Sequence, residues 1–399
     1  MSWTTIRADE YCESVRDGTH DTPKQTETGY KLVTGKHIKN GQIDPSDAYC
    51  ISEKDYKKIN ERSLVEQWDV LMSMIGTVGE VAVVKDHPNY AIKNVALFKC
   101  AGSELKGKWL AYYLQSSDAQ GHMSGNQKGS SQQFLSLKQL RSLPVPVADE
   151  TYMQKVVDVL STYDDLIENN QKQIKLLEEA AQRLYKEWFV ELRFPGHETT
   201  PITDGIPEGW VRYKFSEIAS IMSGGTPKTD VKEYYDGNIP FYTPKDSDGS
   251  FFAFDTITHI SKSGLDHCNS QYYPSGTVII TARGTVGKTT ILAVPMAMNQ
   301  SCYALKCDEL NSPYYLFFSL NKEVAALKTM ANGGVFNTII VKTFDSIHLT
   351  MPTHEVLVAF DAAISPIMDQ VKVKMQQNAR LAEARDRLLP KLMNGEIEV

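Results

Sequence analysis

The sequence predicts an α+β fold in which two strand-rich α/β domains alternate with two long helices that pair as an antiparallel coiled coil. The first observation is an unbroken heptad seam, whose positions step by four and three residues from Val156 to Trp188. The second is that the same phase returns 204 residues later, from Phe360 to Leu392. The third is that short motifs outside the helices repeat in the same order at nearly this offset. Together these observations predict a tandem repeat with pseudo-two-fold symmetry.

The two seams differ mainly in polarity. The first consists of Val156, Leu160, Tyr163, Ile167, Asn170, Ile174, Leu177, Ala181, Leu184 and Trp188. The second consists of Phe360, Ile364, Ile367, Val371, Lys374, Asn378, Leu381, Arg385, Leu388 and Leu392. Its polar members, Lys374, Asn378 and Arg385, either fix the register of the pair against Asn170 or remain solvated where the seam is incomplete.

Composition bounds the class of protein. A chain of 399 residues suits about two to four domains, and 42% apolar with 23% charged residues is typical of a globular protein. The sequence contains neither a long apolar run nor the features of a signal peptide, so we expect a cytoplasmic protein. The six cysteines lack CxxC or metal-ligand spacing and are expected to be free thiols. A formal net charge of −7 excludes a uniformly basic nucleic-acid binder, so any basic face must be local.

The first domain alternates short β-branched runs with turn residues. A strand is predicted at Asp69–Ile75, a turn at Gly76–Gly79 and the returning strand at Glu80–Val84. A short helix is predicted at Trp109–Gln115, followed by a polar glycine loop at Gly121–Gln133. The domain is therefore expected to be mixed, with more strand than helix.

The first long helix is expected to run from about Tyr152 to Leu192. The segment that follows it, from Arg193 to Trp210, is rich in proline and glycine and is expected to be a linker. The pattern of the first domain then restarts. The matching elements are Trp3 with Trp210, Gly18-Thr19 with Gly225-Thr226, Gly76–Gly79 with the identical Gly284–Gly287, and Lys99-Cys100 with Lys306-Cys307. A strand is predicted at Gly276–Ala282, and Pro366 should kink or restart the second helix.

The predicted boundaries follow from this order. The globular domains occupy residues 1–150 and 210–352, the helices 151–193 and 353–399, and the linker 194–209. From Tyr163 to Phe189 the first helix would be roughly 40 Å long, which is about one turn of B-DNA. Two domains at opposite ends of an antiparallel helix pair would share the two-fold symmetry of a DNA backbone.

Several motifs resemble those of the specificity subunit of type I restriction-modification systems, over nearly the whole chain. The motifs are Asp17-Gly18-Thr19-His20 with Thr22-Pro23, Ser223-Gly224-Gly225-Thr226-Pro227, Ile206-Pro207-Glu208-Gly209-Trp210, and the tail from Arg387 to Ile397, RLLPKLMNGEI. The tail is the most specific of these.

The resemblance implies a function and a set of partners. Each globular domain would be a target-recognition domain that reads one half of a split double-stranded DNA site. The two helices would act as spacer and as docking surface for two methyltransferase (modification) subunits, which two restriction subunits can join. The chain itself would have no catalytic residue, metal or cofactor. S-adenosylmethionine for adenine N6 methylation, and ATP and Mg²⁺ for restriction, would be bound by the partner subunits.

Candidate DNA-binding residues lie in polar glycine loops, where backbone can approach phosphate and side chains can reach base edges. In the first domain they are Thr19, His20, Lys36, Thr77, Lys128, Ser130, Gln132 and Gln133. In the second they are Thr226, Lys228, Lys245, Arg283, Thr285, Lys288, Asn332 and Asn337. The candidate residues for the coiled coil and subunit docking are Leu160, Ile167, Ile174, Leu177, Leu184, Trp188, Ile364, Val371, Leu381, Leu388 and Leu392.

The sequence is also compatible with two other classes of function, an NTPase and a protein-binding scaffold. Residues Ala282–Thr289, ARGTVGKT, nearly spell a phosphate-binding loop, which would make Lys288 part of an NTPase. A true phosphate-binding loop is followed directly by a helix, whose N-terminal N–H groups bind the phosphate. Here Thr290–Val294 is expected to continue as a strand, so a hairpin turn is the better interpretation. Alternatively, the chain is a tandem-repeat scaffold that binds proteins through its coiled coil and never touches DNA.

Overall fold

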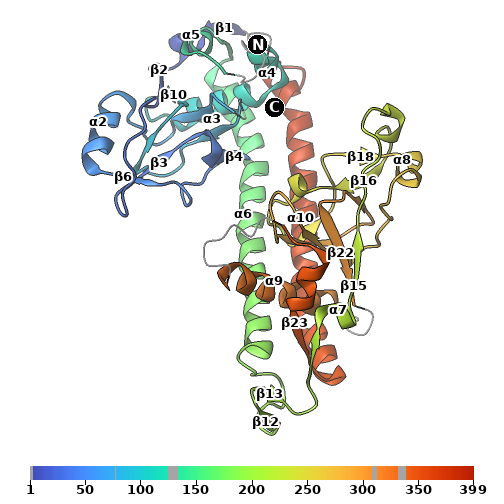
Figure 1. Ribbon diagram of the computed structural model, residues 1–399. Coiled ribbons are helices and arrows are strands. Elements are labelled where there is room, and N and C mark those ends of the chain that lie inside the picture. Colours follow the sequence, from blue (N-terminus) through green and yellow to red (C-terminus); the bar gives the residue numbers. More distant parts are fainter. Residues whose placement is uncertain (1–2, 77, 125–133, 308–311, 331–337) are drawn as a thin grey trace. The chain divides into compact units, whose positions relative to one another are not determined.

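The computed structural model describes residues 3–399 except 77, 125–133, 308–311 and 331–337 (Figure 1). The chain forms two compact units. Unit 1 comprises Met1–Ile167 and Arg380–Val399, and unit 2 comprises Glu168–Ala379. Each unit therefore combines one globular domain with parts of both long helices, α6 (Glu150–Phe189) and α10 (His354–Met393).

Unit 1 contains a four-stranded antiparallel sheet in the order β2-β10-β7-β8 and a three-stranded sheet in the order β6-β3-β9. In the second sheet β3 and β9 run parallel. Helix α3 begins after Ser103, whose side chain accepts a hydrogen bond from Lys106 N, so it is longer than predicted. The elements are β1 (Thr4–Arg7), α1 (Ala8–Tyr11), β2 (Ser14–Asp17), β3 (Tyr30–Val33), η1 (Gly35–His37), β4 (Ile38–Lys39), β5 (Gln42–Ile43), β6 (Cys50–Ile51), α2 (Glu53–Ser63), β7 (Val70–Ser73), β8 (Val81–Val83), β9 (Tyr90–Ile92), β10 (Val95–Lys99), α3 (Glu104–Gln115), α4 (Ser117–Ser124), α5 (Leu137–Arg141) and β11 (Pro144–Val147).

Unit 2 repeats this topology. Its larger sheet has the order β15-β22-β19-β20-β17, and its smaller sheet has the order β18-β16-β21 with β16 parallel to β21. The added strand β17 is the main difference. The elements are β12 (Ile202–Thr203), β13 (Ile206–Pro207), β14 (Val211–Lys214), α7 (Phe215–Ile218), β15 (Ser220–Ser223), η2 (Lys232–Tyr234), β16 (Ile239–Tyr242), η3 (Pro244–Asp246), β17 (Phe252–Ala253), β18 (His259–Ile260), α8 (Lys262–Asp266), β19 (Val278–Thr281), β20 (Thr289–Leu292), β21 (Ala297–Met298), β22 (Cys302–Lys306), α9 (Pro313–Met330), η4 (Val341–Ser346) and β23 (His348–Met351).

The predicted repeat extends to individual hydrogen bonds of the two glycine hairpins. In unit 1, Gly79 N donates to Ser73 O at 3.0 Å, and in unit 2 Gly287 N donates to Thr281 O at 2.8 Å. The donors of the two hydrogen bonds, and likewise their acceptors, are separated by the same offset of 208 residues. The α+β prediction with an internal repeat is therefore confirmed.

The long helices run antiparallel within each unit. In unit 1, Tyr152 near the start of α6 donates its hydroxyl to Leu392 O near the end of α10, at 2.9 Å. In unit 2, the rings of Trp188 and Phe360 lie 5.8 Å apart. None of the candidate coiled-coil residues is exposed. Leu160, Ile364, Val371 and Leu392 are buried, and Ile167, Ile174, Leu177, Leu184, Trp188, Leu381 and Leu388 are partly buried.

The polar seam residues mostly have partners. Lys374 Nζ donates to Asn170 Oδ1 at 3.5 Å in unit 2, and Arg385 Nη1 pairs with Asp164 Oδ1 at 2.6 Å in unit 1. These contacts favour the interpretation that polar residues fix the register. Asn378 differs, because its buried Oδ1 has no hydrogen-bond partner in the part of the chain that the structure describes.

Two helix predictions need correction. Helix α6 ends at Phe189 rather than near Leu192, because Leu192 adopts the left-handed conformation at φ +55° and Arg193 N donates back to Glu187 O at 2.8 Å. Helix α10 does not restart at Pro366 but continues through it. The fully buried side chains of Ile364 and Met368 on either side offset the lost backbone hydrogen bond. All six cysteines are free, as predicted.

Candidate nucleic-acid interface

In unit 2, the parallel strands β16 and β21 end at an edge where several loops meet. Tyr242 lies opposite Met298 in this pair. Asn299 N donates to Tyr242 O at 2.9 Å, and Gly225 N donates to Met298 O at 3.1 Å. The Gly-Thr loop is thereby fixed at the carboxyl ends of the two strands.

Glycine is required for this close approach. A Cβ atom on Gly224 would lie 2.2 Å from Asn299 O, so any side chain would displace the loop. The neighbouring Thr226 is exposed, and its hydroxyl donates to Gln300 Oε1. A threonine and an amide therefore stand together at the end of the strands, where both could reach a base edge or a phosphate.

The hairpin between β19 and β20 completes the same edge. Thr285 Oγ1 donates to Pro244 O at 3.3 Å, which joins the hairpin turn to the η3 turn that carries Lys245. The structure thus brings together four of the predicted residues, which we call the second edge: Thr226, Lys245, Arg283 and Thr285.

The cations of this region are available to a ligand. Lys228, Lys245 and Arg283 are exposed, and their side chains form no hydrogen bond or ion pair with any described residue. Exposed lysine and arginine side chains without a carboxylate partner suit DNA phosphates, and a planar guanidinium can also pair with guanine.

Unit 1 builds a corresponding edge from β3 and β9. Thr19 N donates to Ile92 O at 3.0 Å, and a Cβ atom on Gly18 would lie 2.3 Å from the same oxygen. The η1 turn follows β3, and a Cβ on Gly35 would lie 3.2 Å from Ser73 Cβ at the base of the hairpin. The structure brings together Thr19, His20 and Lys36, which we call the first edge.

Lys36 is the cation of the η1 turn. Its Nζ lies 3.1 Å from Asp47 Oδ2, and this hydrogen bond lowers the pKa of Asp47. Burial lowers the pKa of the neighbouring His37, whose Nδ1 accepts a hydrogen bond from Thr34 N at 2.8 Å. His37 is therefore neutral near pH 7, and a DNA phosphate at this turn would compete with Asp47 for Lys36.

The segment that resembles a phosphate-binding loop is a hairpin turn. Gly287 N donates to Thr281 O, and Lys288 N donates to Thr281 Oγ1 at 3.0 Å, so neither amide can cradle a phosphate. Lys288 Nζ donates to Ser247 O at 3.0 Å, which ties this predicted DNA-binding side chain to the fold. The sequence prediction of a β-hairpin is confirmed.

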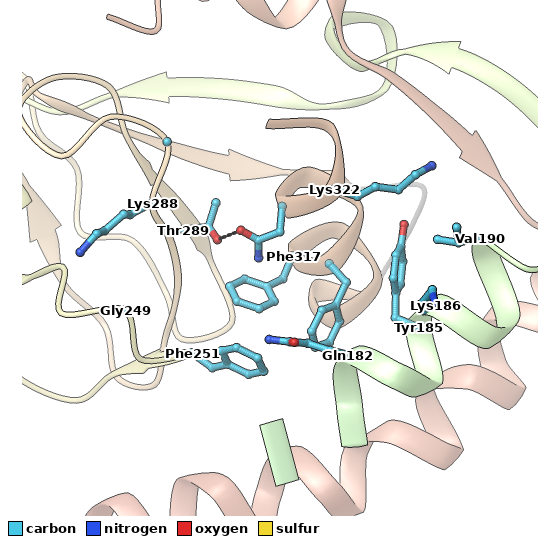
Figure 2. A pocket seen from close by; sticks show the side chains of 13 residues that line it. Gln182, Tyr185, Lys186, Val190, Gly249, Phe251, Lys288, Thr289, Phe317 and Lys322 are labelled. Carbon is cyan, nitrogen blue, oxygen red and sulfur yellow. Dashed lines mark hydrogen bonds between the residues drawn. The ribbon is translucent and has the colours of Figure 1, made fainter. Parts of the chain in front are cut away.

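A cavity of about 550 Å³ lies beside this hairpin. Its wall includes the mostly buried rings of Phe251 and Phe317, and Thr289 Oγ1 donates to Asn321 Oδ1 at 2.5 Å. Figure 2 shows Lys288 turned away from these two rings. The ammonium group and the apolar wall therefore do not converge on one ligand position.

Sequence reasoning missed several residues at the edges. Lys93 pairs with Thr19 through the backbone, and its Nζ lies 2.5 Å from Thr22 Oγ1. Gln300 accepts the hydrogen bond from Thr226. Lys93 follows β9 and Gln300 lies two residues after β21. A polar residue placed just after a short strand is the sequence signal that could have identified both. The predicted residues that lie outside the described residues are Thr77, Lys128, Ser130, Gln132, Gln133, Asn332 and Asn337.

Among the described residues, no group of three or more histidine, cysteine, aspartate or glutamate side chains could hold a metal ion. In the same part of the chain, no helix combines the length and apolar character that a membrane span requires.

The chain is similar to known proteins in sequence and in fold. The chain is 25% identical to the HindI specificity subunit of Haemophilus influenzae over 318 residues, which cover 64% of this chain and 69% of the relative. It is 23% identical to the MjaIX specificity subunit of Methanocaldococcus jannaschii, over 88% of this chain and 82% of that one. The solved S subunit of a type I restriction-modification system from M. genitalium has the same fold, with a TM-score of 0.55 and 14% identity over 98% of this chain and 96% of that one.

The family described as the type I restriction modification DNA specificity domain matches residues 2–179 and again residues 207–383. Each match contains one globular domain and most of the long helix that follows it. The chain therefore belongs to the type I restriction-modification DNA specificity family and is a DNA sequence-specificity subunit.

Proposed function

We propose that this subunit reads a split DNA target, with the first edge reading one half-site and the second edge reading the other. The observation that carries the proposal is the construction of the same edge twice, at the ends of β3 and β9 and of β16 and β21. Each edge presents a threonine and a lysine, Thr19 with Lys36 and Thr226 with Lys245. Lysine would bind phosphate, and short polar side chains would reach base edges.

The overall negative charge is compatible with this role. DNA affinity depends on the cations that meet the phosphates rather than on net charge, and the exposed Lys228, Lys245 and Arg283 have no carboxylate partner among the described residues. Binding to DNA should therefore weaken steeply with salt, because each phosphate contact releases a counterion.

The helices would dock the partner subunits. Leu176 and Val373 are 65% and 50% exposed on the parts of α6 and α10 in unit 2, and Leu166 is 47% exposed on α6 in unit 1. These apolar side chains would lie within the interface with the partner subunits. We propose that two modification subunits bind there and methylate adenine N6, and that two restriction subunits join them in systems that cleave DNA.

The catalytic residues for methylation and cleavage would belong to the partner subunits. Modification subunits would bind S-adenosylmethionine, restriction subunits would bind ATP and Mg²⁺, and this chain would contribute no catalytic residue and no cofactor. The complex would act in the cytoplasm.

A map of adenine methylation in cells with and without this gene tests the proposal. Loss of one split motif on deletion, and its return on complementation, is the expected result. A map that stays unchanged while the modification subunit remains active on other DNA would refute it.

A further inference from the structure

A buried carboxylate lies directly behind the first edge. Asp17, at the end of β2, is 4% exposed. Its Oδ1 accepts a hydrogen bond from Arg62 Nη2 of α2, and its Oδ2 lies 2.9 Å from His20 Nε2. A carboxylate with so little exposure needs hydrogen-bond partners within the protein, and the contact with the guanidinium is a charge-assisted one.

His20 carries the connection onward to β9. Its Nδ1 lies 2.7 Å from Asn94 Oδ1, two residues after this strand, and Asn94 N donates to Thr19 O at 3.2 Å. Asp17 therefore joins the Gly-Thr loop to helix α2 through Arg62 and, by way of His20, to the end of β9. Both ring nitrogens of His20 have protein partners, so its imidazole links the loop to β2 and to the end of β9.

Helix α2 does not pack directly against this side of the loop. A cavity of about 370 Å³ separates it from α2, and its wall includes Thr19, Thr22, Lys58 and Arg62. On this side the loop is joined to the helix through Asp17 and Arg62. Its backbone is held on the other side by hydrogen bonds from Gly18 N to Val95 O at 2.9 Å and from Thr19 N to Ile92 O at 3.0 Å.

We propose that Asp17 is a positioning residue that orients the Gly-Thr loop of the first edge and so determines how well one half-site is discriminated. This inference rests on the proposed bipartite reading. Unit 2 has no counterpart, because Asp17 corresponds to Gly224 at the 207-residue offset, and the bond between Thr226 and Gln300 holds that loop instead. The role of Asp17 is therefore confined to one half-site.

The test uses the complete complex with its modification subunits and a set of duplexes in which each base pair of the split target is substituted in turn. Discrimination is the ratio of kcat/KM for the matched duplex to that for a substituted one. For Asp17→Asn we expect discrimination to fall about tenfold at every position of one half-site, since a misplaced edge weakens all its base contacts together. The other half-site should not change.

Other variants keep the test interpretable if Asp17→Asn does not fold. His20→Ala changes a side chain that is 63% exposed and should relax the same half-site to a smaller extent. Gln300→Ala should relax the opposite half-site. Asp255→Asn is the matched control, because Asp255 also pairs with a histidine, His259 at 2.8 Å, but its side chain is 71% exposed and it belongs to neither edge.

The outcomes separate the possible roles. A loss at a single base position would make these residues base readers, and an equal loss in both half-sites would indicate a general structural defect. Either result, or unchanged discrimination, overturns the inference while leaving bipartite reading intact. If the unmodified complex itself shows no discrimination in either half-site, the proposed function fails as well.

Discussion

In unit 1 a polar cluster of Asp164, Arg385 and Tyr112 joins the two long helices, and the cost of breaking it can be predicted. Asp164 of α6 accepts hydrogen bonds from Arg385 Nη1 of α10 and from Tyr112 OH of α3, each at 2.6 Å. The side chains of Arg385 and Asp164 are 21% and 31% exposed. Replacing Arg385 with methionine would preserve most of the packing volume but leave Asp164 without its cation.

The expected cost lies between two limits. Exposed ion pairs contribute about 0.2–1 kcal/mol, whereas breaking a buried pair costs about 3–5 kcal/mol. The pair between Arg385 and Asp164 is mostly but not fully buried, and Arg385 also contacts the exposed Asp386 at 2.8 Å. We therefore expect Arg385→Met to lower the free energy of unfolding by about 2 kcal/mol.

The assay is urea unfolding followed by circular dichroism, with hydrogen exchange to locate the change within unit 1. A double-mutant cycle with Asp164→Asn should give a coupling energy of about 1–2 kcal/mol. Arg387→Met is the matched control, because Arg387 lies on the same helix but its ion pair with Glu383 involves a side chain that is 78% exposed. If Arg385→Met and Arg387→Met have equal effects, the cluster does not fix the helix pair.

Three further predictions concern the core, an edge and pH. Phe360→Ala should destabilise the protein by about 3–5 kcal/mol in urea unfolding, because Phe360 is fully buried, whereas Val358→Ala, at a half-exposed site, should cost under about 0.5 kcal/mol. Gly224→Ala should weaken DNA binding in a gel-shift assay because its Cβ would strike Asn299 O; Gly121→Ala, with nothing within 4 Å, should not. Burial raises the pKa of Glu178 above its ordinary 4.5, so its ionised form is disfavoured in the folded state. Glu178→Gln should therefore raise the melting temperature at pH 7, with a gain that shrinks as the pH falls towards 4.5.

The long helices could be predicted from sequence because their signal is extended. A seam that holds its phase from Val156 to Trp188, and again from Phe360 to Leu392, is characteristic of paired helices, and antiparallel pairing follows from the repeat. Pro366 led to the wrong prediction of a restart, because a local rule about proline could not include the burial of Ile364 and Met368 around it.

The edges were only partly predictable. Glycine-threonine motifs and hairpin turns are local, so Thr19, Thr226 and Thr285 could be selected directly from the sequence. The parallel pairs that assemble the edges involve β9 and β21, which are only three and two residues long and leave no periodic pattern. For this reason the partners of Asp17, Lys93 and Gln300, which come from distant segments of the chain, could not be predicted.

Exchange of one recognition domain tests the central claim most directly. Residues 210–352 would be replaced by the corresponding domain of a family member with a different, known target, and adenine methylation would be mapped in cells that carry the hybrid. We expect one half of the split motif to change to that of the donor while the other half is kept. A hybrid that methylates the original motif unchanged, or loses both halves while the complex still assembles, would contradict reading by two independent edges.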